Sequence, residues 1–419
     1  MSDDRRKDGE KNILELSLLH RAMEFFEQPQ SWAVWRVALL AMLLAGGMGL
    51  AWRAASAPVV VAFAAGALLL LFFAADSLLL RYLPRRRISF GPWKAQAIVL
   101  LLPRAATGAA LALVGAWAGW AAALLALLAL QLLGLALLWW GAVVEPQRLS
   151  LTRLEVTLPG LPADAPPVRL LHISDIHLER ITAREEALLA LAASAEPDAI
   201  VITGDYVNLS YNRDEKTLSQ VRGLLQRLRA PHGVYATLGS PPVDLRQTVA
   251  PLFEDLPVCL LRDGWAALDL GQGRRLVILG VDCTHHLDED GQRLHEVVSA
   301  APNGVPRLLL YHSPELMPQA AAHGLDLYLC GHTHGGQVRL PLLGPILTSS
   351  QLGRRYVMGH YREGSTQLYV SRGVGLEGLS APRVRFLAPP EITLVEVSGL
   401  RKGRDTEDHG EGREERRRV

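Results

Sequence analysis

Residues 327–336 read Leu-Tyr-Leu-Cys-Gly-His-Thr-His-Gly-Gly, an apolar run followed at once by two histidines among glycines. A short apolar run of this kind is typical of a buried strand. Histidines surrounded by glycines contribute little to packing, and glycine lets the backbone come close to a ligand. The stretch therefore predicts a buried strand that delivers His332 and His334 to a site at its carboxyl end.

The same arrangement occurs at three other places between residues 168 and 312. Apolar runs there end in polar side chains of the same kind, namely Asp175 with His177, Asp205, and His312. Ligands of an open α/β sheet bind beyond the carboxyl ends of its strands, so we expect the four strand ends to meet at one edge. Residues two apart on an extended chain point the same way, so His332 and His334 are expected to act as a pair, like Asp175 and His177.

Two carboxylates and four imidazoles at one edge predict a metal site. Such ligands together suit Mn, Fe, Zn or Co. Without a cation, two close carboxylates would repel each other and the pKa of one would rise. Six ligands exceed the need of one tetrahedral zinc ion and suit two ions that share a carboxylate, an arrangement used for attack on phosphorus. A structural role is the common explanation for any one of these residues alone, but not for the whole set.

The segments around these residues predict an α/β fold, because short apolar runs alternate with longer amphipathic stretches. We expect strands at residues 168–173, 199–203, 233–238, 276–281, 307–311, 326–329 and 367–370. We expect helices at residues 182–194 and 216–229. Thr182 and Glu185 have the spacing of a capping box at the start of the first helix.

The first third of the chain has the pattern of a membrane protein. Residues 105–144 contain no Asp, Glu, Lys or Arg, and as a helix they would be roughly 60 Å long, about two crossings of a bilayer core. A turn near residues 115–120 would make them a helical hairpin. Residues 54–75 supply another span, and residues 32–52 a further one in which Arg36 can snorkel to the headgroups. We therefore predict four transmembrane helices.

The basic residues predict the orientation of these helices. Residues 81–94 hold five Lys and Arg and no acidic residue, whereas the loop between the first two helices offers only Arg53. The positive-inside rule then places residues 81–94, the N-terminus and everything after Val144 in the cytoplasm. We expect an integral, multi-pass protein of the cytoplasmic (inner) membrane. Asp76 and Arg104 are interpreted as helix-end residues, so no transport pathway is expected.

Composition divides the chain into four parts. We expect a cytoplasmic N-terminal segment at 1–31, a transmembrane helical domain at 32–144, an α/β domain at 145–400 and a disordered charged tail at 401–419. Hydrophobic residues make up 49% of the chain and charged residues 20%, which excludes a disordered chain. A net charge of +1 gives no reason to expect a nucleic-acid partner. Three scattered cysteines are too few for a disulfide framework.

These motifs resemble the calcineurin-like metallophosphoesterase superfamily, in the branch with N-terminal membrane helices. The resemblance rests on Asp175-Ile-His177, Gly204-Asp205, His312 and Gly331-His332-Thr333-His334, and it continues through residues 335–341, 371–375 and 389–391. It implies a four-layer α/β/β/α sandwich, preceded here by the membrane helices, over two divalent metal ions. It further implies that Asp175, His177, Asp205 and His334 hold the first ion, and that Asp205 bridges to a second ion held by His312 and His332.

One motif departs from the family pattern. The family has Gly-Asn-His followed by an acidic residue after the third strand, where this chain has Gly239-Ser240-Pro241-Pro242. Ser240 takes the place of the asparagine that ligates the second metal, and Pro241 that of the histidine that protonates the leaving group. Proline has no proton to give, and loss of a general acid costs about 10²–10⁴-fold in rate. The catalytic group is therefore unknown from the sequence.

Because of this departure, the sequence leaves several functions open. The first is a membrane-anchored, metal-dependent phosphoesterase that hydrolyses a phosphodiester or pyrophosphate bond by two-metal activation of water. Its substrate would be lipid-linked or a nucleotide, and some membrane-associated relatives cleave the pyrophosphate of a UDP-linked diacylglucosamine. Residues 88–104 would lie along the membrane surface beside such a substrate, or begin the third helix.

The alternative is a catalytically impaired protein that binds metal or a phosphorylated ligand. A nearby histidine can also substitute for the missing one, although we expect His232, His285 and His286 to be surface loop residues. In a third class of function, the membrane helices are the functional part and the α/β domain is a sensor for them.

Overall fold

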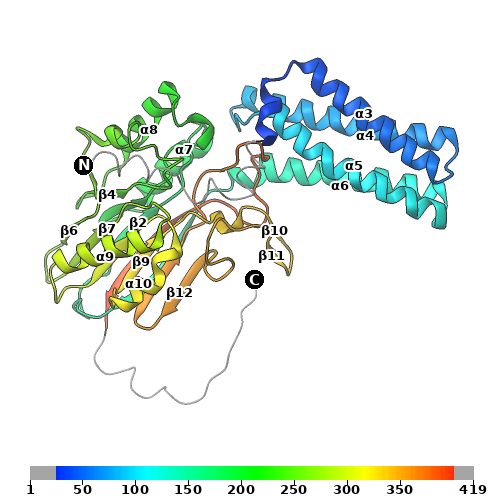
Figure 1. Ribbon diagram of the computed structural model, residues 1–419. Helices are drawn as coiled ribbons and strands as arrows, with labels where there is room; N and C mark the ends of the chain where they lie inside the picture. Colours follow the sequence, from blue (N-terminus) through cyan, green and yellow to red (C-terminus); the bar gives the residue numbers. More distant parts are fainter. Residues whose placement is uncertain (1–24, 401–419) are drawn as a thin grey trace, which may run out of the picture.

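The structure, a computed structural model, describes residues 25–400. A rod of four long helices extends from a layered α/β body (Figure 1). The predicted tail at 401–419 and most of the predicted segment at 1–31 lie outside the described residues.

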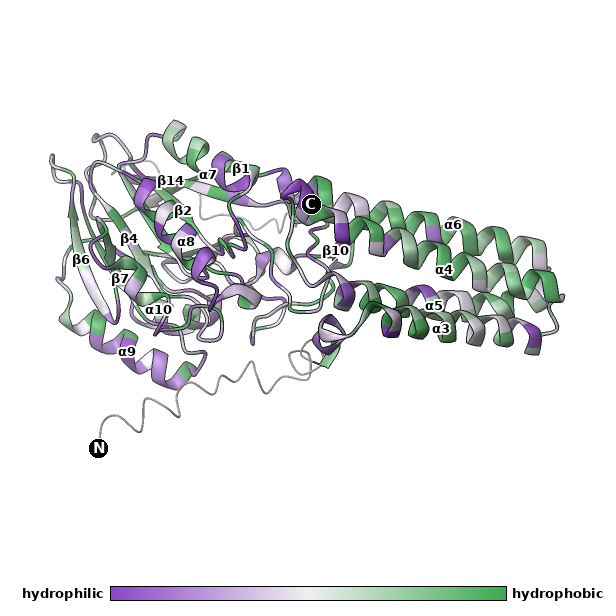
Figure 2. Ribbon diagram, turned by 90° about the horizontal axis from the view of Figure 1, so that it is seen from above, coloured by the Kyte–Doolittle hydropathy of each residue, from purple (hydrophilic) through white to green (hydrophobic). Residues whose placement is uncertain are grey.

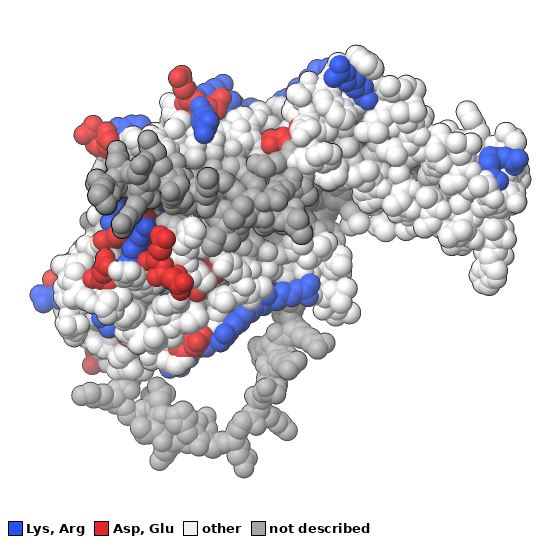
Figure 3. All heavy atoms as spheres, in the orientation of Figure 1, with Lys and Arg blue, Asp and Glu red and all other residues white. Residues whose placement is uncertain are grey.

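The rod consists of four helices that are predominantly apolar (Figure 2). They follow the short helix η2 (Gln28–Ser31) and are α3 (Val34–Ala54), α4 (Val59–Tyr82), α5 (Trp93–Ala118) and α6 (Trp120–Trp139). Each is long and apolar enough to cross a membrane, which confirms the predicted four helices. On the face in Figure 3, charged side chains are scattered over the α/β body but lie only near the two ends of the rod. Gly119, with φ of 97°, makes the turn between α5 and α6 within the predicted region.

The third helix begins twelve residues earlier than the predicted uncharged run, at Trp93. Residues 93–104 are therefore the start of α5, and Arg104 lies inside the helix. Asp76 lies inside α4 and is also buried. The interpretation of these two residues as helix-end residues was wrong, because each charge has a partner within the rod.

Arg104 and Asp76 form a buried, two-pronged ion pair. Arg104 Nε is 2.6 Å from Asp76 Oδ2, and a terminal nitrogen of Arg104 is 2.8 Å from Asp76 Oδ1. The other terminal nitrogen donates to the side-chain oxygen of Gln131 on α6 at 2.6 Å. Charged side chains inside apolar helices are tolerated when they pair with one another in this way, and the cluster joins α4, α5 and α6.

The α/β body contains two six-stranded sheets. The first has the order β1 (Ser150–Leu158), β14 (Glu391–Gly399), β2 (Val168–Ile173), β3 (Ala199–Thr203), β4 (Val234–Thr237) and β5 (Val258–Leu260). The second has the order β12 (Gly359–Glu363), β13 (Thr366–Val370), β9 (Leu327–Cys330), β8 (Arg307–Leu310), β7 (Arg275–Gly280) and β6 (Gly264–Asp269). The central strands of both sheets are parallel, as the alternation of strands and helices predicts.

Side-chain alternation along the strands makes four layers. Leu170 and Val201 of the first sheet pack against Ile278 of the second, whereas Leu171 and Ile173 point the other way. The outer faces are covered by helices α7 (Ala183–Ser194) and α8 (Glu215–Arg227) on one side, and α9 (Leu287–Ala300) and α10 (Met317–Ala322) on the other (Figure 1). The four-layer α/β/β/α sandwich is confirmed.

The seven predicted strands and two predicted helices all form, with ends within two residues of their predicted positions. The capping box of Thr182 and Glu185 opens α7 as predicted. Strands β1, β14, β5, β6 and β12 were not predicted from the sequence.

Loss of one partner of the buried ion pair is expected to destabilise the rod. In Arg104→Leu the Asp76 carboxylate keeps its burial but loses its guanidinium, so we expect the free energy of unfolding in detergent to fall by about 3–5 kcal/mol. The double variant D76L/R104L, which buries no charge, should recover most of that loss. Thermal unfolding of the purified chain tests this, with the exposed Arg36→Leu as control. Equal stability of R104L and R36L would contradict the structural role.

Candidate metal centre

Four strands from both sheets end at one edge of the sandwich. β2 and β3 of the first sheet, and β8 and β9 of the second, each end within four residues of a predicted ligand. The structure brings all six predicted site residues together there, and each is at least 94% buried: Asp175, His177, Asp205, His312, His332 and His334.

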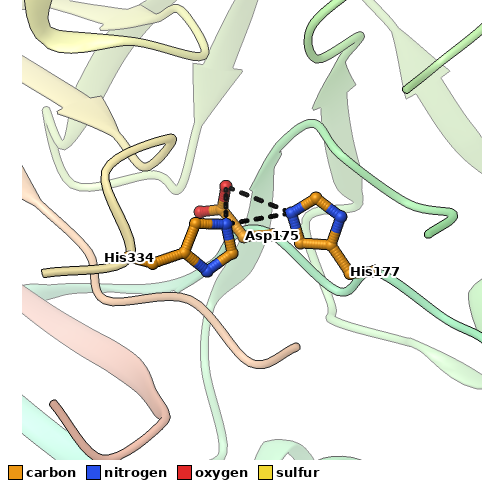
Figure 4. A group of neighbouring side chains, drawn as sticks. All are labelled: Asp175, His177 and His334. Atoms are coloured by element: carbon orange, nitrogen blue, oxygen red, sulfur yellow. Dashed lines mark hydrogen bonds and ion pairs between the residues drawn. The ribbon is translucent and has the colours of Figure 1, made fainter. Parts of the chain in front are cut away.

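The first group consists of Asp175, His177 and His334 (Figure 4). The Nε2 atoms of His177 and His334 face each other at 3.0 Å. Asp175 Oδ1 lies 3.6 Å from His334 Nε2 and 4.0 Å from His177 Nε2. Three potential ligand atoms therefore converge on one point.

The second group consists of Asp205, His312 and His332. His312 Nε2 lies 3.2 Å from both Asp205 Oδ2 and His332 Nδ1. Asp205 Oδ2 is also 3.5 Å from His177 Nε2, so this carboxylate lies between the two groups. The expectation that His332 and His334 act as one pair was wrong, because they belong to different groups.

The backbone conformation explains that separation. His332 and His334 have φ of 71° and 51°, and Asp175, His177 and Asp205 also have positive φ between 41° and 56°. This left-handed region is unfavourable for residues with a Cβ atom, so neighbouring side chains do not follow the alternation of a strand. Backbone strain of this kind clusters at functional sites, and here it affects five of the six residues.

Glycines make room for the two carboxylates. A Cβ atom on Gly331 would lie 2.0 Å from Asp175 Oδ2, and one on Gly239 would lie 2.0 Å from Asp205 Oδ1. Both positions are therefore closed to any larger residue. Gly331, beside the two histidines, thus makes room for a carboxylate, and the close approach of backbone to a ligand stays a prediction.

Residues outside the six hold the imidazoles in place. Glu377 Oε2 lies 2.6 Å from His177 Nδ1, and Arg385 lies 3.3 Å from His334 Nδ1. Asp244 accepts hydrogen bonds from the backbone N–H groups of Asp205, Tyr206 and Gly239. Carboxylates behind histidine rings fix the orientation of metal ligands in the same way. None of these residues was predicted from the sequence, although Glu377 and Arg385 lie between the segments 371–375 and 389–391 that resemble the family.

Electrostatics in the site favour a cation. Burial lowers the pKa of His177, but Glu377, Asp205 and Asp175 outweigh it and raise that pKa to about 9. Burial also opposes protonation of His312, yet the Asp205 carboxylate raises the pKa of this histidine to about 10. Without a metal ion, protons balance the charge of the buried carboxylates. Carboxylate and imidazole donors that converge in this way fit divalent metal ions, which would replace the protons.

The segment that departs from the family pattern lies at the same edge. Ser240 is buried, and its backbone N–H donates to Asp205 Oδ1 at 2.8 Å. Pro241 follows it, half-buried. His285 is fully buried beside the second group, which corrects the expectation of a surface residue. His232 and His286 are half-buried and belong to neither group.

Metal affinity is expected to rise with pH. A metal ion must displace the protons of His177 and His312, which are bound below pH 9 to 10. The apparent affinity for Mn²⁺ should therefore increase by about tenfold or more per pH unit between pH 6 and 8. Calorimetric titration in buffers of different ionisation enthalpy measures both affinity and proton release. Glu377→Gln should reduce the proton release, and a pH-independent affinity would contradict this assignment.

Comparison with known proteins agrees with this geometry. The calcineurin-like phosphoesterase family profile matches residues 168–336, which include all six predicted ligands. A metallophosphoesterase of Bacillus subtilis, YkuE, is 30% identical over 60% of this chain and 86% of its own length.

Two other relatives carry more specific names. Phosphodiesterase YaeI of Escherichia coli is 28% identical over 56% of this chain and 83% of its own length. The UDP-2,3-diacylglucosamine pyrophosphatase LpxG of Chlamydia muridarum is 25% identical over 61% of this chain and 91% of its own. With two sheets that converge on buried Asp and His groups and a matching family profile, this chain belongs to the calcineurin-like phosphoesterase family and is a metallophosphoesterase, a hydrolase.

Proposed function

We propose that this protein hydrolyses a pyrophosphate or phosphodiester bond of a lipid-linked substrate at the membrane surface. The proposal of a lipid-linked substrate rests on one observation. An exposed apolar hairpin lies between the metal centre and the end of the rod nearest the α/β body. Two divalent ions, Mn, Fe, Zn or Co, would be held by Asp175, His177, His334 and by Asp205, His312, His332. Such ions lower the pKa of water and stabilise charge on the phosphoryl oxygens.

The apolar hairpin comprises residues 339–347, with the short strands β10 (Arg339–Leu340) and β11 (Gly344–Pro345). Leu342 at its tip is 98% exposed and Leu343 is 67% exposed. Leu340, Ile346 and Leu347 are exposed as well. A cluster of exposed large apolar side chains is uncommon on soluble proteins and marks a surface for a partner or a membrane.

Backbone contacts place the hairpin close to the end of α6. Arg339 N–H donates to Phe386 O, and the neighbouring Arg385 N–H donates to Gly141 O, each at 2.9 Å. Gly141 follows Trp139 and Trp140, which are both exposed. Exposed tryptophans at the end of an apolar helix are typical of the membrane–water interface. The hairpin therefore lies near the level at which the bilayer ends.

The base of the hairpin reaches the metal centre from two sides. The helical turn η9 (His334–Gly336) leads from a predicted ligand into the first strand of the hairpin. On the other side, His332 Nε2 lies 3.3 Å from Ser349 O. A substrate whose phosphate lies at the metals can thus have its acyl chains beside the apolar hairpin.

The missing histidine favours a pyrophosphate over an alkyl phosphodiester. Pro241 cannot donate a proton, so an alkoxide leaving group would depart unassisted. Cleavage of a pyrophosphate releases a phosphate monoester, whose second pKa of about 6 lets it leave as an anion at neutral pH. The name of the relative LpxG agrees with this class, and a UDP-linked diacylglucosamine is the candidate substrate.

The α/β body is proposed to lie in the cytoplasm. Five basic residues lie between the last turn of α4 and the first turn of α5, at the end of the rod that carries the body: Arg81, Arg85, Arg86, Arg87 and Lys94. Arg87 and the neighbouring Phe90 contact the body through Ile181 O and Glu179 Oε2. At the opposite end, the described residues offer a single basic residue, Arg53, in the last turn of α3. The positive-inside rule then makes this a multi-pass protein of the cytoplasmic membrane.

Hydrolysis should depend on the carboxylate between the two groups. Asp205→Asn removes a negative charge that both proposed ions share, so hydrolysis of bis-p-nitrophenyl phosphate with Mn²⁺ should fall more than about 100-fold. The exposed Asp255→Asn has the same change in side chain and the same positive φ, and should leave the rate unchanged. Metal binding without turnover by the natural chain would instead support a metal-binding protein that lacks activity.

The hairpin should matter only for lipid-linked substrates. In L342S/L343S we expect hydrolysis of UDP-2,3-diacylglucosamine in mixed micelles to fall about tenfold or more, because about 2 kcal/mol of burial per leucine is lost. Hydrolysis of bis-p-nitrophenyl phosphate should not change. The matched variant L342M/L343M keeps the apolar surface and should retain both activities. An equal effect on both substrates would contradict a role in lipid recognition and leave a soluble nucleotide as the substrate.

A further inference from the structure

A third buried group of potential ligands adjoins the metal centre. It consists of His285, Glu315 and His332, whose ligand atoms lie within 4.8 Å of one another. His285 follows β7, and Glu315 lies in the short helix η8 (Pro314–Leu316). Both side chains are at least 99% buried. The group shares His332 with the second group described above.

One nitrogen of His285 points toward the second group. His285 Nε2 lies 3.0 Å from Ser240 Oγ, which lies 3.5 Å from His332 Nδ1. Ser240 stands where the family has a metal-binding asparagine, and its side chain is one bond shorter. The imidazole of His285 approaches the space that the longer amide would use. Cys283 Sγ is 3.6 Å from the same nitrogen, but a thiol is a weak donor.

The other nitrogen of His285 faces a carboxylate. His285 Nδ1 lies 3.9 Å from Glu315 Oε2, and within residues 25–400 neither atom has a hydrogen-bond partner. Gln351 holds both residues, since its backbone N–H donates to Glu315 Oε1 and its side chain donates to the backbone oxygen of His285. A histidine that ligates a metal commonly presents its second nitrogen to a carboxylate in this way.

The backbone of His285 resembles that of the proposed ligands. Its φ of 63° lies in the same left-handed region as the φ angles of Asp205 and His332. A histidine with only a packing role would leave two buried polar atoms unsatisfied, at a cost of about 1–3 kcal/mol each. Packing alone explains neither that cost nor the strain.

We propose that His285 Nε2 is a ligand of the second divalent ion, in place of the family's asparagine, and that Glu315 is the positioning residue behind it. Asp205, His312 and His332 would supply the other protein ligands, with Ser240 Oγ beside them. This inference rests on the proposed two-metal centre. An imidazole in place of an amide oxygen should also shift the preference of the site toward Zn²⁺ and Fe²⁺ over Mg²⁺.

The number of bound ions tests this assignment. The full chain in detergent, loaded with Mn²⁺ and dialysed, should hold two ions by elemental analysis and show the electron paramagnetic resonance signal of a coupled manganese pair. His285→Ala should hold one ion and lose the coupled signal, and added imidazole should restore both. Glu315→Gln should lower the affinity for the second ion by about 10–100-fold. The half-buried neighbour His286→Ala is the control and should keep two ions.

Each other outcome has a distinct meaning. A natural chain that binds no ion would overturn both the two-metal centre and the role of His285. A natural chain with two ions and an H285A variant that also keeps two, at unchanged affinity, would overturn the role of His285 alone. The same conclusion would follow if H285A lost both ions and imidazole restored neither.

Discussion

The position of Asp205 between two histidine groups is the constraint on which the rest of the site depends. Its Oδ2 lies 3.5 Å from His177, which follows a strand of the first sheet, and 3.2 Å from His312, which follows a strand of the second. The two sheets must therefore keep their relative position to within a fraction of an ångström. The core between them, where Leu170 and Val201 pack on Ile278, provides that rigidity.

The segment between β13 and β14 connects this centre to the rod of apolar helices. Between β13 and β14, Glu377 contacts His177, Arg385 contacts His334, and the backbone of Arg385 binds Gly141 beyond α6. Glu145, just after the rod, accepts a hydrogen bond from Ala388 N–H in the same segment. The orientation of two proposed ligands is thus tied to the end of the apolar helices. For the proposed lipid-linked substrate, this arrangement would keep the metal centre at a fixed distance from the end of the apolar helices.

The sequence predicts the centre of each sheet better than its edges. β2, β3, β8 and β9 are short apolar runs that end in Asp or His, so both their burial and their chemistry are visible locally. β1 and β14 carry Arg153, Glu155 and Glu396 among their apolar residues and have no such signal. The pairing of Arg104 with Asp76 and the burial of His285 depend on contacts between distant segments. No periodicity in one segment reveals such contacts, and the left-handed backbone that separates His332 from His334 is equally invisible.

The change from Asn-His to Ser240-Pro241 separates two roles that the family assigns to adjacent residues. Metal binding by the asparagine can pass to His285, because that imidazole reaches the same space from β7. Pro241 cannot replace the histidine that protonates the leaving group. The site therefore favours hydrolysis of bonds whose leaving group departs as an anion. A pyrophosphate meets this requirement and an alkyl ester does not. In the proposed function, the lost histidine therefore limits the choice of substrate, and the apolar hairpin determines where that substrate binds.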